Sequence, residues 1–230
     1  MIRKCEIIAK GCFSRATLVV GVLLVLPCLA GTDAPKIDTL MTGHEDHSHH
    51  LAMMKQAKGY TRSEKKYVIP DVKLVDMNNN TIRLRQLLDT DEPVLLQFIF
   101  ATCTTICPVL SATFSAAQAQ LDGLGMKYRM VSITIDPEED TPEHLRTYAN
   151  RFKSDGQWTF LTGSTENIET VERAFKVYAS NNKMYHQPYT FLRSRVGAPW
   201  VRIEGFTSAE ELVTEFQKMP AISKVSPRTP

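Results

Sequence analysis

The segment PVLLQFIF at positions 93–100 constrains the fold of this chain more than any other stretch. It is an almost continuous run of apolar residues, as expected for a strand that is buried on both faces of a sheet. Two further runs, KYRMVSITID at 127–136 and WTFLTG at 158–163, predict two more buried strands. YTFLRS at 189–194 and WVRIEGF at 200–206 predict a pair of strands separated by a turn at Gly197. The sequence therefore predicts a sheet with covered central strands.

Helical patterns alternate with these strands. Apolar residues fall on one stripe from Cys107 to about Leu121. A second helix is predicted where Thr141 can cap and Pro142 suits the first helical position. Two more are predicted around 168–178 and 208–218. This alternation predicts an α/β fold, in which helices flank a central mixed sheet with parallel strands in its middle.

Two cysteines, Cys103 and Cys107, follow the first buried strand and lie four positions apart. In open α/β sheets, active residues gather beyond the carboxyl ends of the strands. If Cys107 opens a helix and Cys103 lies on the loop before it, the sulfurs come within disulfide range and can face one ion. A structural disulfide across so short a loop would stabilise the fold only weakly. A redox couple and a soft-metal site are therefore the favoured interpretations.

The first thirty residues have the pattern of a targeting segment. A basic stretch at 1–15 precedes an uncharged apolar stretch at 16–30. This predicts either a cleaved signal peptide or an uncleaved N-terminal membrane anchor, and in both cases export of the rest of the chain. The other three cysteines lie in this segment, at positions 5, 12 and 28. Cleavage after Ala30 would leave Cys103 and Cys107 as the only pair.

Residues 31–65 are predicted to be a flexible linker rich in His and Met, followed by a folded domain at 66–220 and a tail at 221–230. The linker holds four of the six histidines, namely His44, His47, His49 and His50. Clustered imidazoles and thioethers suit copper and zinc, so this tract is a candidate auxiliary metal site. A polar tether without metal is the alternative. The net charge of +2, with scattered basic residues, predicts no nucleic-acid partner.

A third ligand would complete a trigonal site for Cu(I), which thiolates suit as soft donors. Two histidines of the predicted domain are candidates. His144 lies in the first turn of a predicted helix among charged residues, which indicates a surface position. His186 lies in the loop before a predicted strand, where a ligand and an ordinary loop histidine are both plausible.

Three segments together resemble the SCO/SenC family of copper chaperones. They are Cys-x-x-x-Cys-Pro after an apolar strand, SITIDPEEDTPEHLRTYANRF at 132–152, and WTFLTGS at 158–164. The resemblance covers roughly residues 67–217. It implies a thioredoxin-like fold of the peroxiredoxin-like variant.

The resemblance also implies a ligand set. The family binds copper through both motif cysteines and a later histidine, which points to Cys103, Cys107 and His186 in this chain. Asp136 matches an acidic position near the metal, although a turn aspartate is an equally good interpretation. Tyr185 stands where the family commonly has an aspartate.

The function implied is that of an exported copper chaperone. It would deliver copper to, or assist assembly of, the CuA site of a respiratory cytochrome c oxidase. The expected location faces the periplasm or the mitochondrial intermembrane space, with membrane attachment only through the N-terminal segment. Expected partners are the oxidase subunit that carries CuA, another copper protein or another copper chaperone.

The alternative is a thiol–disulfide oxidoreductase that acts on the cysteines of an apo-copper protein through Cys103 and Cys107. His186 would then be dispensable. A peroxidase would need an activating neighbour such as arginine, and none stands near Cys103 in the sequence. A metallochaperone is therefore expected rather than an enzyme.

Overall fold

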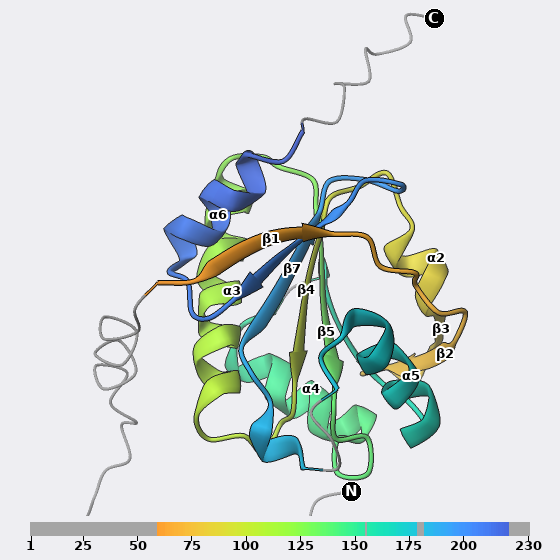
Figure 1. Ribbon diagram of the computed structural model, residues 1–230. Coiled ribbons are helices and arrows are strands. Elements are labelled where there is room, and N and C mark those ends of the chain that lie inside the picture. The colour runs from red at the N-terminus through yellow and green to blue at the C-terminus, as the bar shows by residue number, and fades with distance from the viewer. Residues whose placement is uncertain (1–58, 155, 179–181, 221–230) are drawn as a thin grey trace, which may run out of the picture. The chain divides into compact units, whose positions relative to one another are not determined.

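The computed structural model describes residues 59–154, 156–178 and 182–220. These residues form an eight-stranded mixed sheet in the order β1-β8-β7-β4-β5-β6-β2-β3, with helices on both faces (Figure 1). Within them, no helix combines the length and the apolar character needed to cross a bilayer. The predicted targeting segment, the four linker histidines and the tail at 221–230 lie outside the described residues.

The predicted central strands are confirmed. All six residues of β4 (Val94–Ile99) are buried. Leu95 and Ile99 belong to one core cluster, while Leu96 and Phe98 belong to the other, as the alternation of a strand requires. β5 (Arg129–Thr134) and β6 (Trp158–Thr162) pair in parallel beside β4. The apolar run therefore reflects a strand that lies between two cores.

The helices divide between the two faces of the sheet. α3 (Ile106–Gly123), α4 (Pro142–Arg151) and α6 (Ala209–Gln217) contribute to one core. α2 (Leu84–Leu88) and α5 (Thr165–Phe175) contribute to the other. α4 begins as predicted, because the Thr141 side chain accepts a hydrogen bond from the backbone N–H of His144 and Pro142 opens the helix. The α/β fold with a flanked mixed sheet is thus confirmed.

The structure corrects the start of the folded region. β1 (Thr61–Lys65) pairs antiparallel with β8 (Trp200–Glu204), so the sheet begins inside the stretch predicted to be linker. Its sequence, TRSEK, has no apolar alternation, because no residue of this edge strand is fully buried. At the other edge, β2 (Lys73–Asp76) and β3 (Thr81–Arg83) lead into α2, a five-residue helix that the sequence did not predict.

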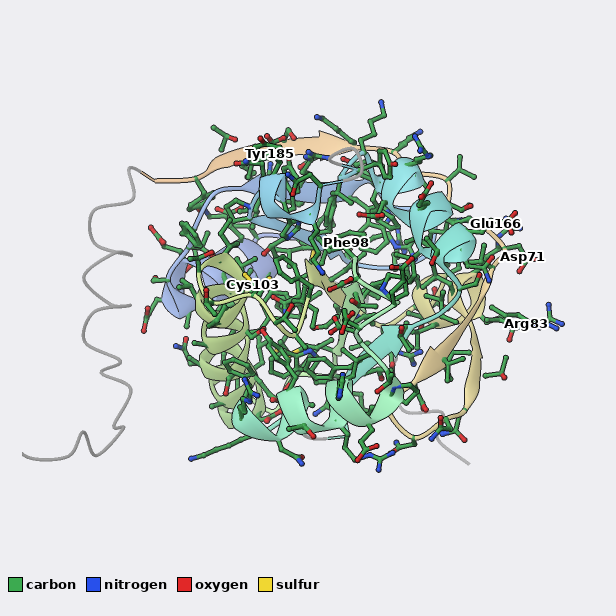
Figure 2. The ribbon with its side chains drawn as sticks, turned by 90° about the horizontal axis from the view of Figure 1, so that it is seen from below. Asp71, Arg83, Phe98, Cys103, Glu166 and Tyr185 are labelled. Atoms are coloured by element: carbon green, nitrogen blue, oxygen red, sulfur yellow. The ribbon has the colours of Figure 1, made fainter. Side chains whose placement is uncertain are left out.

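Strand directions bring three distant segments to one end of the sheet. β4 and β5 are parallel, so their carboxyl ends share an edge. β7 (Tyr189–Arg193) is antiparallel to β4, so its beginning lies at the same edge. The loops that contain Cys103, Asp136 and His186 attach at these three points. Figure 2 views this end of the sheet, with Phe98, Cys103 and Tyr185 labelled.

Candidate metal centre

The two cysteines occupy the junction between β4 and α3. The backbone N–H of Cys103 donates to the carbonyl of Phe100 at 3.1 Å, which forms a tight turn after the strand. Cys107 lies in the first turn of α3, and its N–H donates to Cys103 Sγ at 3.3 Å. The N–H of Phe100 in turn donates to Cys107 Sγ at 3.4 Å. Backbone donors therefore fix both sulfurs, and the two cysteines are not joined in a disulfide.

The two thiols differ in acidity. The hydrogen bond from the Cys107 thiol, with help from the N–H groups of Cys107 and Thr105, lowers the pKa of Cys103 to about 5 despite its burial. The same hydrogen bond and burial raise the pKa of Cys107. Near neutral pH, Cys103 is thus a thiolate, a soft donor, and Cys107 is the thiol that donates to it. This asymmetry also suits a redox pair.

His186 is held by its loop with its ring in the interior. The loop includes a short 3-10 turn, η1 (Lys183–Tyr185), and the His186 N–H donates to the Lys183 carbonyl at 3.0 Å. The side chain is only 2% exposed. Nε2 lies 3.1 Å from the carbonyl oxygen of Phe98. Because a carbonyl only accepts, this contact assigns the ring proton to Nε2.

The other ring nitrogen is then a free acceptor. Nδ1 of His186 is buried and has no hydrogen-bond partner among the described residues. Burial lowers the pKa of His186 to about 4, which outweighs the favourable contact with the Phe98 carbonyl. The ring is therefore neutral at physiological pH. A neutral imidazole with an unshared lone pair is the form that ligates metals.

The structure places these residues around one strand end without closing a three-ligand cluster. The Phe98 carbonyl accepts from His186, and the Phe100 N–H donates to Cys107. Because Phe98 and Phe100 are two positions apart, their backbone polar groups point to the same edge of the strand. Within the described ranges, however, no three His, Cys, Asp or Glu side chains have an arrangement that could hold a metal ion. The cysteines are together, and His186 lies beside the same strand end. The three-residue ligand set stays a prediction.

Acidic side chains behind the cysteine loop form a network that the sequence did not reveal. The buried carboxylate of Asp140 accepts from the Ala101 N–H at 3.0 Å and from the Thr134 hydroxyl at 2.5 Å. Burial raises its pKa, although both hydrogen bonds oppose the rise. Asp136 forms an ion pair with Lys183. The Asp136 N–H also donates to the Thr134 hydroxyl at 2.9 Å, so the network joins the cysteine loop, the end of β5 and the histidine loop.

The other residues considered in the sequence analysis, His144 and Tyr185, lie at the surface. His144 is exposed, as predicted, and its Nδ1 lies 2.6 Å from the Glu139 carbonyl. Tyr185, beside His186, is 67% exposed. The acidic run at 136–140 was the available signal for the network, but Ala101 lies 39 positions from Asp140 and Lys183 lies 47 positions from Asp136.

Comparison with known proteins identifies the family. The SCO1/SenC family model matches residues 60–220, and the chain belongs to this family. The SCO1 protein homolog of Bacillus subtilis (strain 168) is 36% identical over 85 residues, which span 36% of this chain and 44% of that protein. The chain thus matches less than half the length of this relative.

Solved structures confirm the thioredoxin-like fold. BsSco, described as a member of the Sco family of cytochrome c oxidase assembly proteins with a disulfide switch, has a TM-score of 0.59 at 23% identity. That match covers 71% of this chain and 98% of BsSco. Copper-bound ScoI of Arabidopsis thaliana has a TM-score of 0.55 at 24% identity and covers 64% of this chain and 94% of that one.

Proposed function

We propose that this chain is a copper chaperone that binds copper as cargo through Cys103, Cys107 and His186. The observation that carries the proposal is the buried Nδ1 of His186, a lone pair without a partner in the described structure, beside the strand end that holds a thiolate and a thiol. Family membership and the copper-bound state of the Arabidopsis relative support it. The donor set of two sulfurs and one imidazole suits Cu(I).

Each residue has a distinct role in this scheme. The Cys103 thiolate is the first donor, because its pKa lies well below neutrality. Cys107 gives up its proton when metal replaces its hydrogen bond to Cys103. His186 contributes Nδ1 after a small movement of its loop, while the Phe98 carbonyl holds the Nε2 proton and so fixes the tautomer. Few ligands at a loop end allow transfer by ligand exchange.

The client proposed is the CuA site of a respiratory cytochrome c oxidase, or another copper protein outside the cytoplasm. The description of BsSco as a member of a cytochrome c oxidase assembly family supports this choice. The N-terminal segment at 1–30 would export or anchor the domain in the periplasm or the intermembrane space. His44, His47, His49 and His50 would collect copper near the site by raising its local concentration.

An anaerobic Cu(I) titration against a competing chelator tests the proposal. The reduced full chain is used with its four linker histidines changed to alanine, so that only the domain site is measured. We expect one Cu(I) per chain and at least tenfold weaker binding for His186→Ala. The matched control is His144→Ala, an exposed histidine, which should bind like its parent. Equal affinity for His186→Ala and its parent would exclude the three-ligand site.

Thiol–disulfide exchange is a second candidate, favoured by the unequal acidity of the two thiols. In that reaction the Cys103 thiolate attacks a partner disulfide, one partner sulfur leaves as a thiolate, and Cys107 then displaces the second while closing a Cys103–Cys107 disulfide. Reduction of a disulfide in an apo-copper protein at a rate unchanged by His186→Ala would support it. No reduction above the rate of Cys107→Ser would exclude it.

A further inference from the structure

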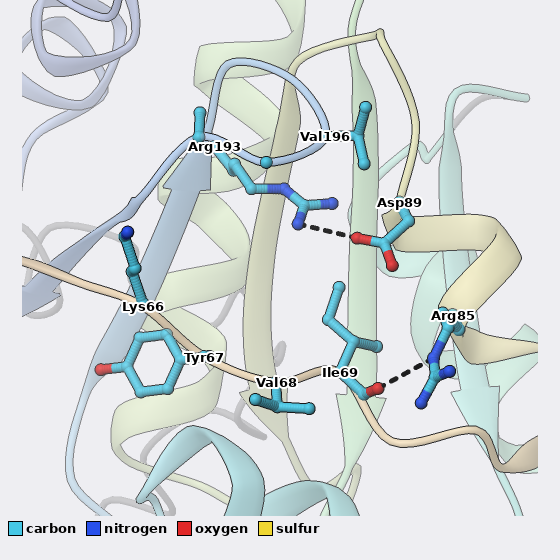
Figure 3. A pocket seen from close by; sticks show the side chains of 10 residues that line it. Lys66, Tyr67, Val68, Ile69, Arg85, Asp89, Arg193 and Val196 are labelled. Carbon is cyan, nitrogen blue, oxygen red and sulfur yellow. Dashed lines mark hydrogen bonds and ion pairs between the residues drawn. The ribbon is translucent and has the colours of Figure 1, made fainter.

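A cavity of about 420 Å³ lies far from the cysteine pair. Its walls come from the segment after β1, from α2, and from the end of β7 with the turn that follows (Figure 3). Arg193 in this wall pairs with Val94 at the start of β4, whereas the cysteines follow the end of that strand. The length of β4, about 17 Å at ~3.3 Å per residue, therefore separates the two places.

Positive charge dominates the lining of this cavity. The lining contains three cationic residues, Lys66, Arg85 and Arg193, and a single carboxylate, that of Asp89. Arg193 is buried and already occupies that carboxylate, because its Nη1 donates to Asp89 at 2.9 Å. In the described part of the chain, neither Lys66 nor Arg85 has a carboxylate partner. The cavity therefore presents two unpaired cations.

Arg85 is pre-positioned for an external anion. Its Nε donates to the carbonyl of Ile69 at 3.1 Å, a contact drawn in Figure 3. This bond fixes the guanidinium beside the cavity and leaves the Nη groups for a ligand. A planar guanidinium held in this way suits a carboxylate, to which it can donate two parallel hydrogen bonds.

The rim of the same cavity is apolar and exposed. Val68 is 82% exposed and Val196 is 46% exposed. They are two of the five large apolar side chains that are exposed within the described residues, and both line this cavity. Exposed apolar side chains rimmed by charge mark interaction sites. A free inorganic anion would make no use of them, whereas a polypeptide surface would.

We propose that this cavity docks an acidic–aliphatic segment of a partner protein. A carboxylate of the segment reaches Arg85, and an aliphatic side chain next to it covers Val68. Lys66 and Val196 border the cavity on its other sides (Figure 3). A partner held there leaves the thiols at the other end of the sheet open. The assignment is independent of what the cysteines bind.

Two peptide probes test the assignment: acetylated, amidated Leu-Asp-Leu and its uncharged counterpart Leu-Asn-Leu. Each is titrated into the ¹⁵N-labelled full chain, with the backbone amides of Ile69, Arg85 and Val196 as reporters in NMR spectra. We expect saturable shifts with Leu-Asp-Leu and at least fivefold weaker binding of Leu-Asn-Leu. Equal binding of the two peptides, or no shifts with either, would overturn the proposal.

Matched variants complete the test. Arg85→Gln should weaken Leu-Asp-Leu binding several-fold and Lys66→Gln should weaken it less, while Arg83→Gln, an exposed arginine outside the cavity, should leave it unchanged. The remaining amide signals report whether each variant is folded. An equal loss with Arg83→Gln would show a diffuse charge effect and overturn the proposed docking site.

Succinate tests whether a small anion is enough. If it saturates the shifts of the same amides with equal affinity, the cavity binds a small anion and the proposal of a peptide partner is overturned.

Discussion

At the scale of single residues, the two ring nitrogens of His186 differ in their surroundings. Its Nε2 proton is committed to Phe98, and its Nδ1 lone pair is buried without a partner in the described structure. An unsatisfied buried acceptor destabilises a fold by about 1–3 kcal/mol. Such a group calls for an explanation, and the soft metal that we propose would supply one.

The burial of His186 predicts a loss of stability in mild acid. Burial lowers the folded-state pKa to about 4 from the ordinary value of 6.5, so the unfolded chain takes up the proton first. The contribution of the neutral His186 to the free energy of unfolding is fully present above pH 6.5 and is lost as the pH falls from 6.5 through 4. The full loss in the free energy of unfolding from this one group is about 3 kcal/mol.

Urea unfolding of the metal-free protein at intervals from pH 7 to pH 4 measures this effect. His186→Gln should lack this part of the pH dependence, while both proteins keep the contributions of their carboxylates. Parallel curves for the two proteins would contradict a buried, neutral histidine.

The ion pair between Lys183 and Asp136 predicts a positioning effect on the histidine loop. Lys183 lies three residues before His186, and its salt bridge ties that loop to the segment after β5. We expect Lys183→Gln to weaken Cu(I) binding about fivefold, which corresponds to the ~1 kcal/mol of a partly exposed pair. Chelator competition measures it, with Lys127→Gln, an exposed lysine elsewhere, as the control.

A double-variant cycle separates the pair from either charge alone. If the two residues act through their contact, Lys183→Gln combined with Asp136→Asn should be no weaker than the worse single variant. Losses that add fully would show that the ion pair does not position His186.

At the scale of elements, the edge strand β1 is fastened by a helix. Glu215 of α6 is 2% exposed and accepts hydrogen bonds from Tyr60, Arg62 and Lys218 at 2.9, 2.8 and 2.7 Å. Tyr60 immediately precedes β1 and Arg62 lies within it, so this carboxylate joins the strand to α6. These hydrogen bonds of Glu215, called the clamp below, explain how a charged, exposed strand stays paired at the edge of the sheet.

Removal of the clamp should destabilise the protein. Glu215→Ala removes the shared acceptor of Tyr60 and Arg62, while Arg62 keeps its exposed pair with Glu64. We expect a loss of about 2 kcal/mol in the free energy of unfolding. The matched control is Glu169→Ala, which breaks the exposed pair with Arg173 and should change stability by no more than about 0.5 kcal/mol. Urea unfolding at pH 7 compares them. Equal losses in both variants would mean that burial gives Glu215 no special role.

The same elements show what a sequence can and cannot predict. β4 is legible because both of its faces are buried, so nearly every residue is apolar. β1 is not legible, because all its residues keep contact with water. α2 has only five residues, too few for a helical stripe. An apolar sequence pattern arises where residues are buried, so short or exposed elements have no pattern by which to predict them.

The candidate site divides in the same way. Cys103, Cys107 and His186 are predicted from residue type, spacing and family resemblance. The contact of Asp136 with Lys183 joins residues 47 positions apart, and that of His186 with Phe98 joins residues 88 apart. The tautomer of the histidine follows from the second contact. Pairings over such distances depend on the folded chain, and no local pattern specifies them.

At the scale of the whole molecule, two cores hold the domain together independently of the candidate site's chemistry. One cluster packs α3, α4 and α6 on the sheet, and the other packs α2 and α5 on its opposite face. Cys103 and Cys107 belong to the first cluster and follow the end of β4. A metal at that place would add to a fold that is already complete.

Copper removal should therefore lower the melting temperature without unfolding the protein. At a free Cu(I) concentration 100-fold above Kd, binding to the folded state alone stabilises it by about 2.7 kcal/mol. For a domain of this size that corresponds to a rise in Tm of roughly 5–10 °C. We expect the metal-free protein to keep its near-UV circular dichroism and to lose only this increment. The Cys103→Ser, Cys107→Ser protein should melt at one temperature with or without copper. Collapse of the near-UV signal on chelation would show instead that the metal is part of the fold, because the two cores alone would then be too weak to hold it.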